Sequence, residues 1–173
     1  DNHILAKLIG GAGQTLAATA IWGTGSADEE KDILDGMDLI FANARVTGNE
    51  PLALILPASA RSQMMNTRLY TNILQSLQER LNTMISLEVF YTRDYGAGSA
   101  MLTNALLLIK GAQTAEFFSY NGDGFQETEL TRIEGVGFSW LLTSYMGSVI
   151  HELDDGAAVG TNNRIVKLTG VIA

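Results

Sequence analysis

The sequence contains no cysteine among its 173 residues. This absence excludes a disulfide scaffold, thiolate zinc sites, iron–sulfur clusters and a cysteine nucleophile. Proline occurs only twice and 46% of the residues are hydrophobic, so the chain is neither disordered nor collagen-like. No apolar run reaches the roughly 18–20 residues that cross a bilayer as a helix, so we expect no membrane partner. The length predicts one domain or a closely joined pair.

Basic residues are also scarce. Eleven Lys and Arg against 19 Asp and Glu give a net charge of −8, which disfavours binding to nucleic acid, sequence-specific or not. The acids cluster, since residues 28–38 hold six acids and one base and residues 114–155 hold eight acids and one base. In contrast, residues 61–80 hold three arginines and one glutamate. Such a chain can bind copies of itself through the basic segment, or the arginines simply keep a surface solvated.

The first clear element is a helix over residues 27–44. Ser26 is expected to cap it, with Glu29 three residues further on, which is the spacing of a capping box. Apolar residues recur from Ile33 to Ala44 at helical spacing and form one stripe. We expect this stripe to pack on a sheet.

The rest of the pattern consists mainly of short apolar runs. The run LALIL at 52–56, ended by a proline, predicts a strand buried on both faces, and a short helix is expected at 58–65. A second amphipathic helix is expected at 72–81. Further strands are expected over residues 87–91, 105–109, 116–120, 126–133, from near 135 onward, and 164–171. A glycine-bearing loop is expected at 92–99, a tight turn at 121–124 and a loop at 154–163. This order predicts an α+β protein.

Two glycine-rich stretches invite a phosphate-binding interpretation. Residues 10–15, GGAGQT, lack the lysine that reaches the phosphates, and we interpret them as a flexible turn. Residues 23–26, GTGS, precede the predicted helix, but the three acids at 28–30 fill its first turn with negative charge and would repel an anion. We therefore expect a structural helix cap at this position.

The chain offers little for catalysis. Only two histidines, His3 and His151, are available as the base of a Ser–His–Asp triad. The G-x-S-x-G sequence that forms a nucleophile elbow does not occur. The NGDG sequence at 121–124 lacks the oxygen donors and terminal glutamate of a calcium loop. HELDD at 151–155 is the only cluster of metal-type side chains, and we interpret it as a solvated loop entry, because one histidine with adjacent acids does not place three ligands on one face. We expect no enzyme activity, no cofactor and no metal.

The order of the elements carries a family resemblance. A Gly-rich entry, a long helix, a buried strand ended by proline and a short helix follow one another in GTGSADEEKDILDGMDLIFANARVTGNEPLALILPASARSQM. A strand, a glycine-containing loop and an apolar strand follow in ISLEVFYTRDYGAGSAMLTNALLLIKG, and closing strands follow in ETELTRIEGVGFSWLLTSYMGSVIHELDDG and NRIVKLTGVIA. This series, over most of residues 22–173, resembles the axial-domain core and closing strands of tailed-bacteriophage major capsid proteins of the Hong Kong 97-type fold.

The resemblance implies an α+β capsid fold, with an axial-domain sheet flanked by helices and part of the peripheral domain. Residues 1–21 would be a remnant of the peripheral-domain spine helix and its linker, 22–134 the axial domain, and 135–173 the closing strands that return to the peripheral domain. Family subunits are longer, and the chain starts at Asp1 without a signal-peptide pattern. We therefore expect an N-terminally truncated or processed subunit whose spine helix survives near residues 3–9. No lysine–asparagine pair is expected to form a covalent crosslink.

The function that the resemblance implies is structural. The chain would be a major capsid subunit that self-assembles through pentamers and hexamers into the icosahedral shell of a tailed phage or prophage. It would be made in the bacterial host cytoplasm and reside in the virion capsid, with a scaffold, a portal and a maturation protease as candidate further partners. The axial loop, residues 65–82, would place Arg68, Tyr70 and Arg80 at a subunit interface, where the arginines meet the acidic segments of a neighbour.

Three other functions stay open on the sequence. An encapsulin-type compartment shell has the same fold and differs in its contents. A head-decoration or tail component would instead assemble into trimers or tubes. A small α+β ligand-binding or hydrolytic domain would have a deep pocket lined by Trp22, Trp140, His151 and nearby acids, whereas a capsid subunit predicts a flat molecule without such a pocket.

Overall fold

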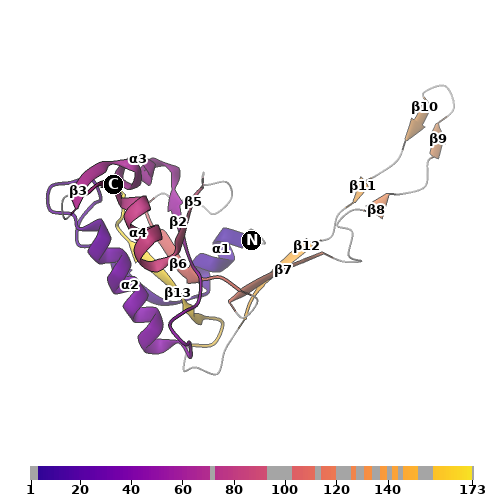
Figure 1. The fold of residues 1–173 in the computed structure, drawn as a ribbon. Coiled ribbons are helices and arrows are strands. Elements are labelled where there is room, and N and C mark those ends of the chain that lie inside the picture. The colour runs from indigo at the N-terminus through magenta and orange to yellow at the C-terminus, as the bar shows by residue number, and fades with distance from the viewer. Residues whose placement is uncertain are drawn as a thin grey trace.

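A five-stranded mixed sheet forms the centre of the molecule (Figure 1). The computed structural model describes residues 4–70, 73–92, 103–111, 114–119, 126–127, 131–133, 137–139, 142–143, 146–151 and 158–172. The strand order is β1 (Ala12–Ala17), β13 (Asn162–Thr169), β6 (Ala105–Ile109), β2 (Leu52–Pro57) and β5 (Leu87–Thr92). β1 is parallel to β13 and β2 is parallel to β5, whereas β6 is antiparallel to both of its neighbours.

The apolar runs of the sequence form the middle of this sheet. The strands expected at 52–56, 87–91 and 105–109 are confirmed as β2, β5 and β6. β2 and β6 pair with Leu54 opposite Leu107, and most of their residues are buried, as strands covered on both faces require. The expected α+β class is confirmed.

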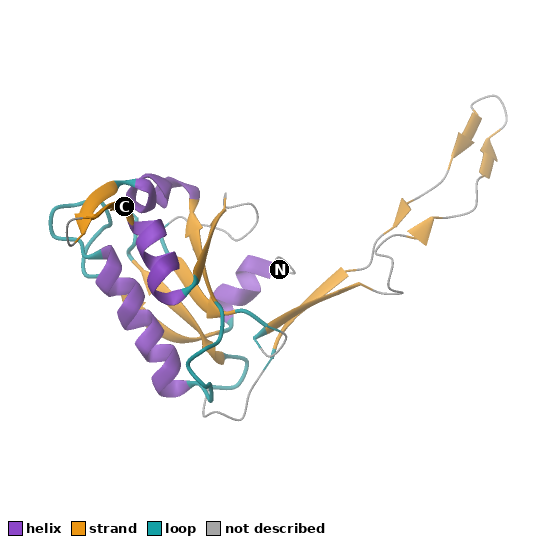
Figure 2. Cartoon of the chain, viewed as in Figure 1, coloured by secondary structure: helices purple, strands orange, loops and turns teal. Residues whose placement is uncertain are grey.

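Helix α2 (Glu29–Asn43) covers one face of the sheet and packs against β13 and β6 (Figure 2). Ile33 and Ile40 are fully buried beneath it, which confirms the apolar stripe. Gly36 lets the helix lie close to the sheet, because a Cβ at this position would be 3.2 Å from Cδ2 of Leu107. A larger side chain at Gly36 would push α2 away from the sheet.

The predicted cap of α2 is wrong. The helix begins at Glu29, and its N-cap is Asp28 instead of Ser26, since the Asp28 carboxylate accepts a hydrogen bond from the Lys31 backbone N at 3.0 Å. Glu29 is buried, and its carboxylate accepts from the backbone N of Gly23 at 3.0 Å. Glu29 therefore holds the glycine-rich entry against the body through Gly23. It does not form the capping box with Ser26 that the sequence predicted.

A short helical stretch, a hairpin and a second helix connect β2 to β5. They are η1 (Ala58–Ala60), α3 (Arg61–Met65), β3 (Thr67–Tyr70), β4 (Ile73–Ser76) and α4 (Leu77–Ile85). The short helix expected at 58–65 is confirmed as η1 and α3. The helix expected at 72–81 starts later, because residues 73–76 pair with β3. Ser76 then begins α4 with a capping box, in which the Glu79 N donates to Ser76 Oγ at 3.2 Å and the Ser76 N donates to the Glu79 carboxylate at 2.8 Å.

Helix α1 (Ile4–Gly10) lies on the second face of the sheet. Its Leu8 packs against Leu106 of β6 and Ile165 of β13, in a cluster separate from the one beneath α2. A helix near residues 3–9 was expected, and the described part of that range, from Ile4, is helical. The sheet is therefore covered on both faces, but by a helix of only seven residues on this side.

The glycine-rich residues 10–15 do not form a flexible turn. Most of them belong to β1, which pairs in parallel with β13. Gly13 makes this pairing possible, because a Cβ at Gly13 would lie 2.7 Å from the carbonyl carbon and oxygen of Asn162. The absence of a side chain thus serves a close approach of two backbones.

Six short strands form a ribbon that projects from the rest of the molecule (Figures 1 and 2). They make three antiparallel pairs: β7 (Ala115–Ser119) with β12 (Met146–Ile150), β8 (Gln126–Glu127) with β11 (Leu142–Thr143), and β9 (Thr131–Ile133) with β10 (Gly137–Ser139). The three pairs follow one another along one ribbon. Ala115 lies opposite Ile150 in the first pair, and Ile133 lies opposite Gly137 in the last. We call these six strands the arm and the sheet with α1–α4 the body.

The arm and β13 refine the expected C-terminal strands. The strand expected at 116–120 is confirmed as β7, while 126–133 contains β8 and β9, and the stretch from 135 contains β10 and β11, with β12 as a further strand. The glycine-bearing loop after Thr92 and the turn at 121–124 lie outside the described residues. β13 confirms the last strand and lies inside the body sheet. The expected part 135–173 therefore combines arm strands with a body strand, and its assignment to a capsid domain stays a prediction.

Candidate assembly surfaces

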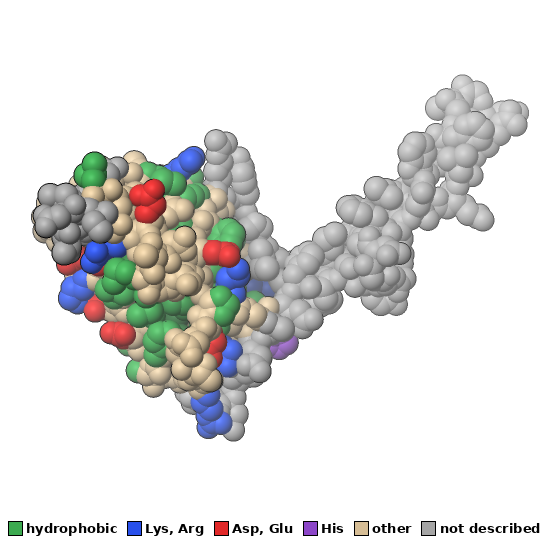
Figure 3. Space-filling view, viewed as in Figure 1, with side chains coloured by type: hydrophobic (Ala, Val, Ile, Leu, Met, Phe, Trp, Pro, Cys, Tyr) green, Lys and Arg blue, Asp and Glu red, His purple; other side chains and the backbone are tan. Residues whose placement is uncertain are grey.

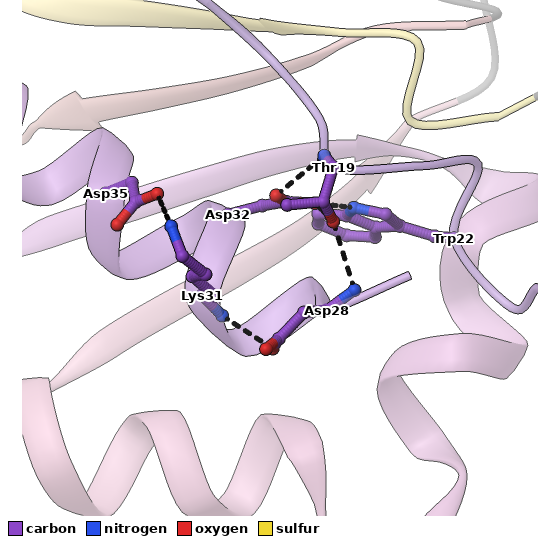
Figure 4. A network of polar contacts seen from close by, with 6 residues as sticks. All are labelled: Thr19, Trp22, Asp28, Lys31, Asp32 and Asp35. Carbon is purple, nitrogen blue, oxygen red and sulfur yellow. Dashed lines mark hydrogen bonds and ion pairs between the residues drawn. The ribbon is translucent and has the colours of Figure 1, made fainter. Parts of the chain in front are cut away.

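A buried carboxylate at the start of α2 holds the segment that leads into the helix (Figure 4). Asp32, 1% exposed, accepts from the indole nitrogen of Trp22 at 2.8 Å and from the backbone N of Thr19 at 2.9 Å. The Thr19 hydroxyl in turn accepts from the Asp28 backbone N at 3.1 Å. These bonds fix residues 19–28 against the body, so the glycine-rich entry is held in place although it does not form the helix cap that the sequence predicted.

The base of the arm is joined to the body by apolar contacts of Ala115 and Ile150 on the α1 side of the sheet, and by one buried amide. Asn162, at the start of β13, donates from Nδ2 to the carbonyl oxygen of His151 at 2.7 Å and to that of Thr114 at 3.4 Å. Thr114 directly precedes β7 and His151 directly follows β12, and the His151 N donates to the Thr114 carbonyl at 3.3 Å. Both strands at the base of the arm are thus held by the same amide, which we call the arm clamp.

The three residues expected at a subunit interface lie on two elements. Arg68 and Tyr70 belong to β3, in the hairpin with β4, and Arg80 belongs to α4. Arg80 Nε donates to both carboxylate oxygens of Glu30 at 2.9 Å, so it pairs with one of the acids of 28–38 within its own chain. The placement of Arg68, Tyr70 and Arg80 at a subunit interface stays a prediction.

The body has a groove of mixed polar and apolar lining between α2 and α4, which we call the helix groove. Its volume is about 380 Å³, and it is lined by Met37, Phe41, Gly48, Asn49, Glu50, Pro51, Leu52, Met84, Ile85 and Ser86. Figure 3 views the body from the side of α2 and α4, where hydrophobic side chains lie among charged ones. Met84 is half exposed at this groove. The sequence gives no sign that these residues line one groove, because they come from α2, α4 and the loop before β2.

Glu50 shapes the loop at one end of the helix groove. Its carboxylate accepts from the backbone N of Thr47 at 2.7 Å, from the Thr47 hydroxyl at 2.9 Å and from the backbone N of Gly48 at 2.8 Å. These donors stabilise the ionised form, the Thr47 backbone N most of all, and they lower the pKa of Glu50 to about 2. Glu50 therefore stays negatively charged at neutral pH.

A second groove, which we call the sheet groove, lies on the α1 side of the sheet. Its volume is about 310 Å³, and it is lined by Leu8, Ala53, Ile55, Phe90, Leu108, Ile109, Lys110, Gly111, Thr114 and Ala115. Lys110 pairs with Glu88 of β5 at 2.7 Å. Phe90 is half exposed because it points away from α2, as its position in the alternation of β5 requires. The alternation of residues along β5 was the one sequence signal that could have revealed the exposure of Phe90.

The residues expected to line an enzyme pocket are far apart. Trp22 is buried beneath α2, and its backbone N donates to the carbonyl of Val171 beyond one end of β13. His151 is held by Asn162 at the other end of β13, which puts the two residues about 20 Å apart. Trp140 lies outside the described residues. The structure therefore does not bring Trp22 and His151 into one pocket.

Two features are absent from the described part of the chain. It contains no group of three or more His, Cys, Asp and Glu side chains that could hold a metal ion, and of the cluster at 151–155 only His151 is described. None of its helices is long and apolar enough to cross a membrane.

Comparisons of the sequence find no matching family model. They also find no curated protein that matches significantly. The relationship to known proteins therefore depends on the three-dimensional fold.

The fold is that of viral capsid subunits of the Hong Kong 97 type. One matching structure is a virus-like particle from Pyrococcus furiosus, with a TM-score of 0.61 and 13% identity over 91% of this chain. Another is the capsid of Myoviridae phage XM1, with a TM-score of 0.61 and 11% identity over 91% of this chain. The chain spans about half the length of these proteins, 56% of the first and 51% of the second.

Proposed function

We propose that the chain is part of a major capsid subunit, a structural protein that self-assembles into a closed shell. The single observation that supports this most is the fold, since one superposition with a virus-like particle and another with a phage capsid each include 91% of the chain. Its partners are then copies of itself, arranged in pentamers and hexamers, and its place is the virion capsid. A scaffold, a portal and a maturation protease are further partners in this proposal, as is synthesis in the cytoplasm of a bacterial host.

The arm supports assembly on physical grounds. A two-stranded ribbon is at best marginally stable in water, because it has no third strand or helix on which to bury a face. β7 and β12 pair with each other and extend beyond the body (Figure 1). In a shell, neighbouring chain segments would cover such a ribbon. We infer that the arm belongs to the peripheral part of the subunit, and that the body sheet with α2 and α4 is the axial part.

The proposed role is non-enzymatic. The buried acids of α2, Glu29 and Asp32, are bound to Gly23, Thr19 and Trp22 and therefore hold the fold together. The separation of Trp22 from His151 argues against the pocket that a ligand-binding or hydrolytic domain would need. This alternative is therefore disfavoured.

An encapsulin-type compartment is the second candidate. The fold gives it equal support, because an encapsulin-type shell is expected to have the same fold. The two candidates differ in what the shell contains, which is DNA for a phage head and protein cargo for a compartment. Purified particles would separate them, since a nuclease-protected genome and a co-purifying protein give different absorbance ratios and mass spectra.

Expression of the full-length product of the gene that encodes this chain tests the proposal. The product would be expressed alone and together with the products of the adjacent genes, and examined by negative-stain electron microscopy and sedimentation. We expect closed shells or capsomer rings. A product that stays monomeric under both conditions would contradict the proposal and restore the small binding domain as the leading candidate.

A further inference from the structure

The arm meets the body where the ends of four elements come together. Gly11 lies between α1 and β1, Ile150 is the last residue of β12, and Asn162 is the first residue of β13. The backbone of Gly11 is held within the body, because its N donates to the carbonyl of Lys7 at 2.7 Å and its carbonyl accepts from the Asn162 N at 2.8 Å. Ile150 packs against this backbone. We call the contact between Gly11 and Ile150 the arm joint.

The arm joint leaves no room for a side chain at Gly11. A Cβ there would lie 2.9 Å from Cγ2 and 3.0 Å from Cγ1 of Ile150, and 3.0 Å from the carbonyl oxygen of Lys7, whereas an ordinary contact needs 3.4 Å or more. Gly11 does not have a positive φ, so the contact requires glycine and the backbone conformation does not. Because Ile150 is β-branched, its side chain has little freedom to rotate away, and relief of the clash needs a movement of β12.

The arm can move more easily than the other side of the joint. Leu8 fixes α1 in the apolar cluster on the sheet, whereas the arm extends away from the body beyond its base (Figure 1). Opening the contact from 2.9 Å to 3.4 Å moves β12 by about 0.5 Å. If β7 keeps its place about 4.8 Å away, the ribbon tilts by about 0.1 radian, which displaces Gln126, about 30 Å further along, by about 3 Å. One methyl group at the joint is therefore amplified along the arm.

We propose that Gly11 is a positioning residue for the arm. Its missing side chain lets β12 rest against the end of α1, and this contact sets the angle between the arm and the body. In a shell, the angle determines how neighbouring subunits are inclined to one another, and therefore the curvature and the diameter of the particle. The step from angle to curvature rests on the proposed capsid function, whereas the step from Gly11 to the angle does not.

Two alanine variants of the full-length product test the angle. G11A adds a methyl group at the arm joint, and G10A adds the same group one residue earlier, where no atom lies within 4 Å. Spin labels on cysteines introduced at Asp38 of α2 and Gln126 of β8 report the distance between the body and the arm. We expect G11A to shift the mean distance by about 1–3 Å, according to the direction of the tilt, and G10A to leave it unchanged. Circular dichroism checks that both variants fold.

A compensating substitution separates positioning from a general loss of stability. In G11A/I150A the added methyl group occupies space that the two γ carbons vacate, so the mean distance should return to within about 1 Å of the wild-type value. I150A alone opens a gap at the joint and should broaden the distance distribution. If G11A acted only by weakening the fold, the double variant would be further from the wild type than G11A, which would overturn the inference.

Particle diameters test the effect on curvature. In electron micrographs, G11A should give a diameter different from the wild type or a mixture of diameters, while G10A and G11A/I150A should give the wild-type particle. An unchanged distance in G11A would overturn the inference even if the wild type forms shells. A shifted distance with wild-type particles would overturn the link to curvature. A wild-type product that never assembles would contradict the proposed function, and the distances would still decide whether Gly11 sets the angle.

Discussion

Removing the arm clamp is expected to destabilise the protein and to release the arm from its fixed orientation. Asn162 is fully buried, and its amide makes hydrogen bonds in different directions. Nδ2 donates to the carbonyls of His151 and Thr114, and Oδ1 accepts from the backbone N of Arg164 at 2.8 Å. In N162A the two carbonyls at the base of the arm lose this donor, and the Arg164 N loses its acceptor.

The size of the effect follows from the number and burial of these bonds. A net hydrogen bond contributes about 1 kcal/mol, and a buried polar group left without its partner costs about 1–3 kcal/mol. Because the 3.4 Å contact to Thr114 is long, we count the bonds to His151 and Arg164 as the main loss. N162A should then lower the free energy of unfolding by about 2–4 kcal/mol. N162D should cost at least as much, because it turns a carboxylate oxygen toward two carbonyl oxygens.

The neighbouring asparagine provides a matched control. Asn163 is also buried, but its amide accepts from Gln14 at 2.9 Å and donates to the Asn43 carbonyl at 3.4 Å, and both of these partners belong to the body. N163A should therefore lower stability without affecting the arm. Urea unfolding measures the first effect for both variants.

Spin labels measure the orientation of the arm. The chain has no cysteine, so cysteines introduced at Asp38 on α2 and Gln126 on β8 would be the only labelling sites. Double electron–electron resonance should give a broader distance distribution in N162A than in the wild type or N163A. An N162A variant that loses less than about 0.5 kcal/mol and keeps the wild-type distribution would refute the clamp, since that loss is within the range of ordinary surface substitutions.

Three further substitutions test the body. D32N should lower the free energy of unfolding by about 2–4 kcal/mol. The amide has an NH2 group in place of one carboxylate oxygen, and this donor faces the N–H of the Trp22 indole or of the Thr19 backbone. An unchanged urea midpoint would contradict this. G13A should cost about 1–3 kcal/mol because its Cβ meets the β13 backbone at 2.7 Å, whereas G10A, with no atom within 4 Å, should be near neutral in the same assay. E50Q should be less stable than the wild type above about pH 4.5, the ordinary pKa of Glu, and the difference should shrink as pH falls and vanish below about pH 2, because the folded-state pKa of Glu50 is lowered to about 2. A difference between wild type and E50Q that did not depend on pH would rule out the proposed role of the ionised carboxylate.

Elements with a strong local pattern could be predicted from the sequence. β2 and β6 are uninterrupted apolar runs, which a strand buried on both faces requires, and α2 repeats apolar residues at helical spacing. The predictions failed where the local sequence fits two different structures. Residues 73–76 fit the apolar spacing of a helix, but they pair with β3 as a hairpin. Ser26 and Asp28 can both cap a helix, and the burial of Glu29 against Gly23 favours the later start.

The candidate surfaces could not be predicted in the same way. The helix groove combines residues of α2, α4 and the loop before β2, and the sheet groove combines α1 with β2, β5 and β6. Arg80 pairs with Glu30 of its own chain, while its expected contact with acids of another copy stays a prediction. Such partners are set by the packing of α4 beside α2, which no spacing within either helix reveals.

The sequence alone excluded cysteine chemistry and predicted the kind of fold, because composition and hydrophobic periodicity act locally and need no knowledge of distant partners. Its element order was enough to indicate the capsid fold, although no family model and no curated protein match the sequence. Only the tertiary structure decided that the expected glycine-rich turn is strand β1, that one asparagine holds both strands at the base of the arm, and that two grooves open on opposite faces of the sheet. Each of these depends on backbones or side chains that are distant in sequence and meet only when the sheet has formed.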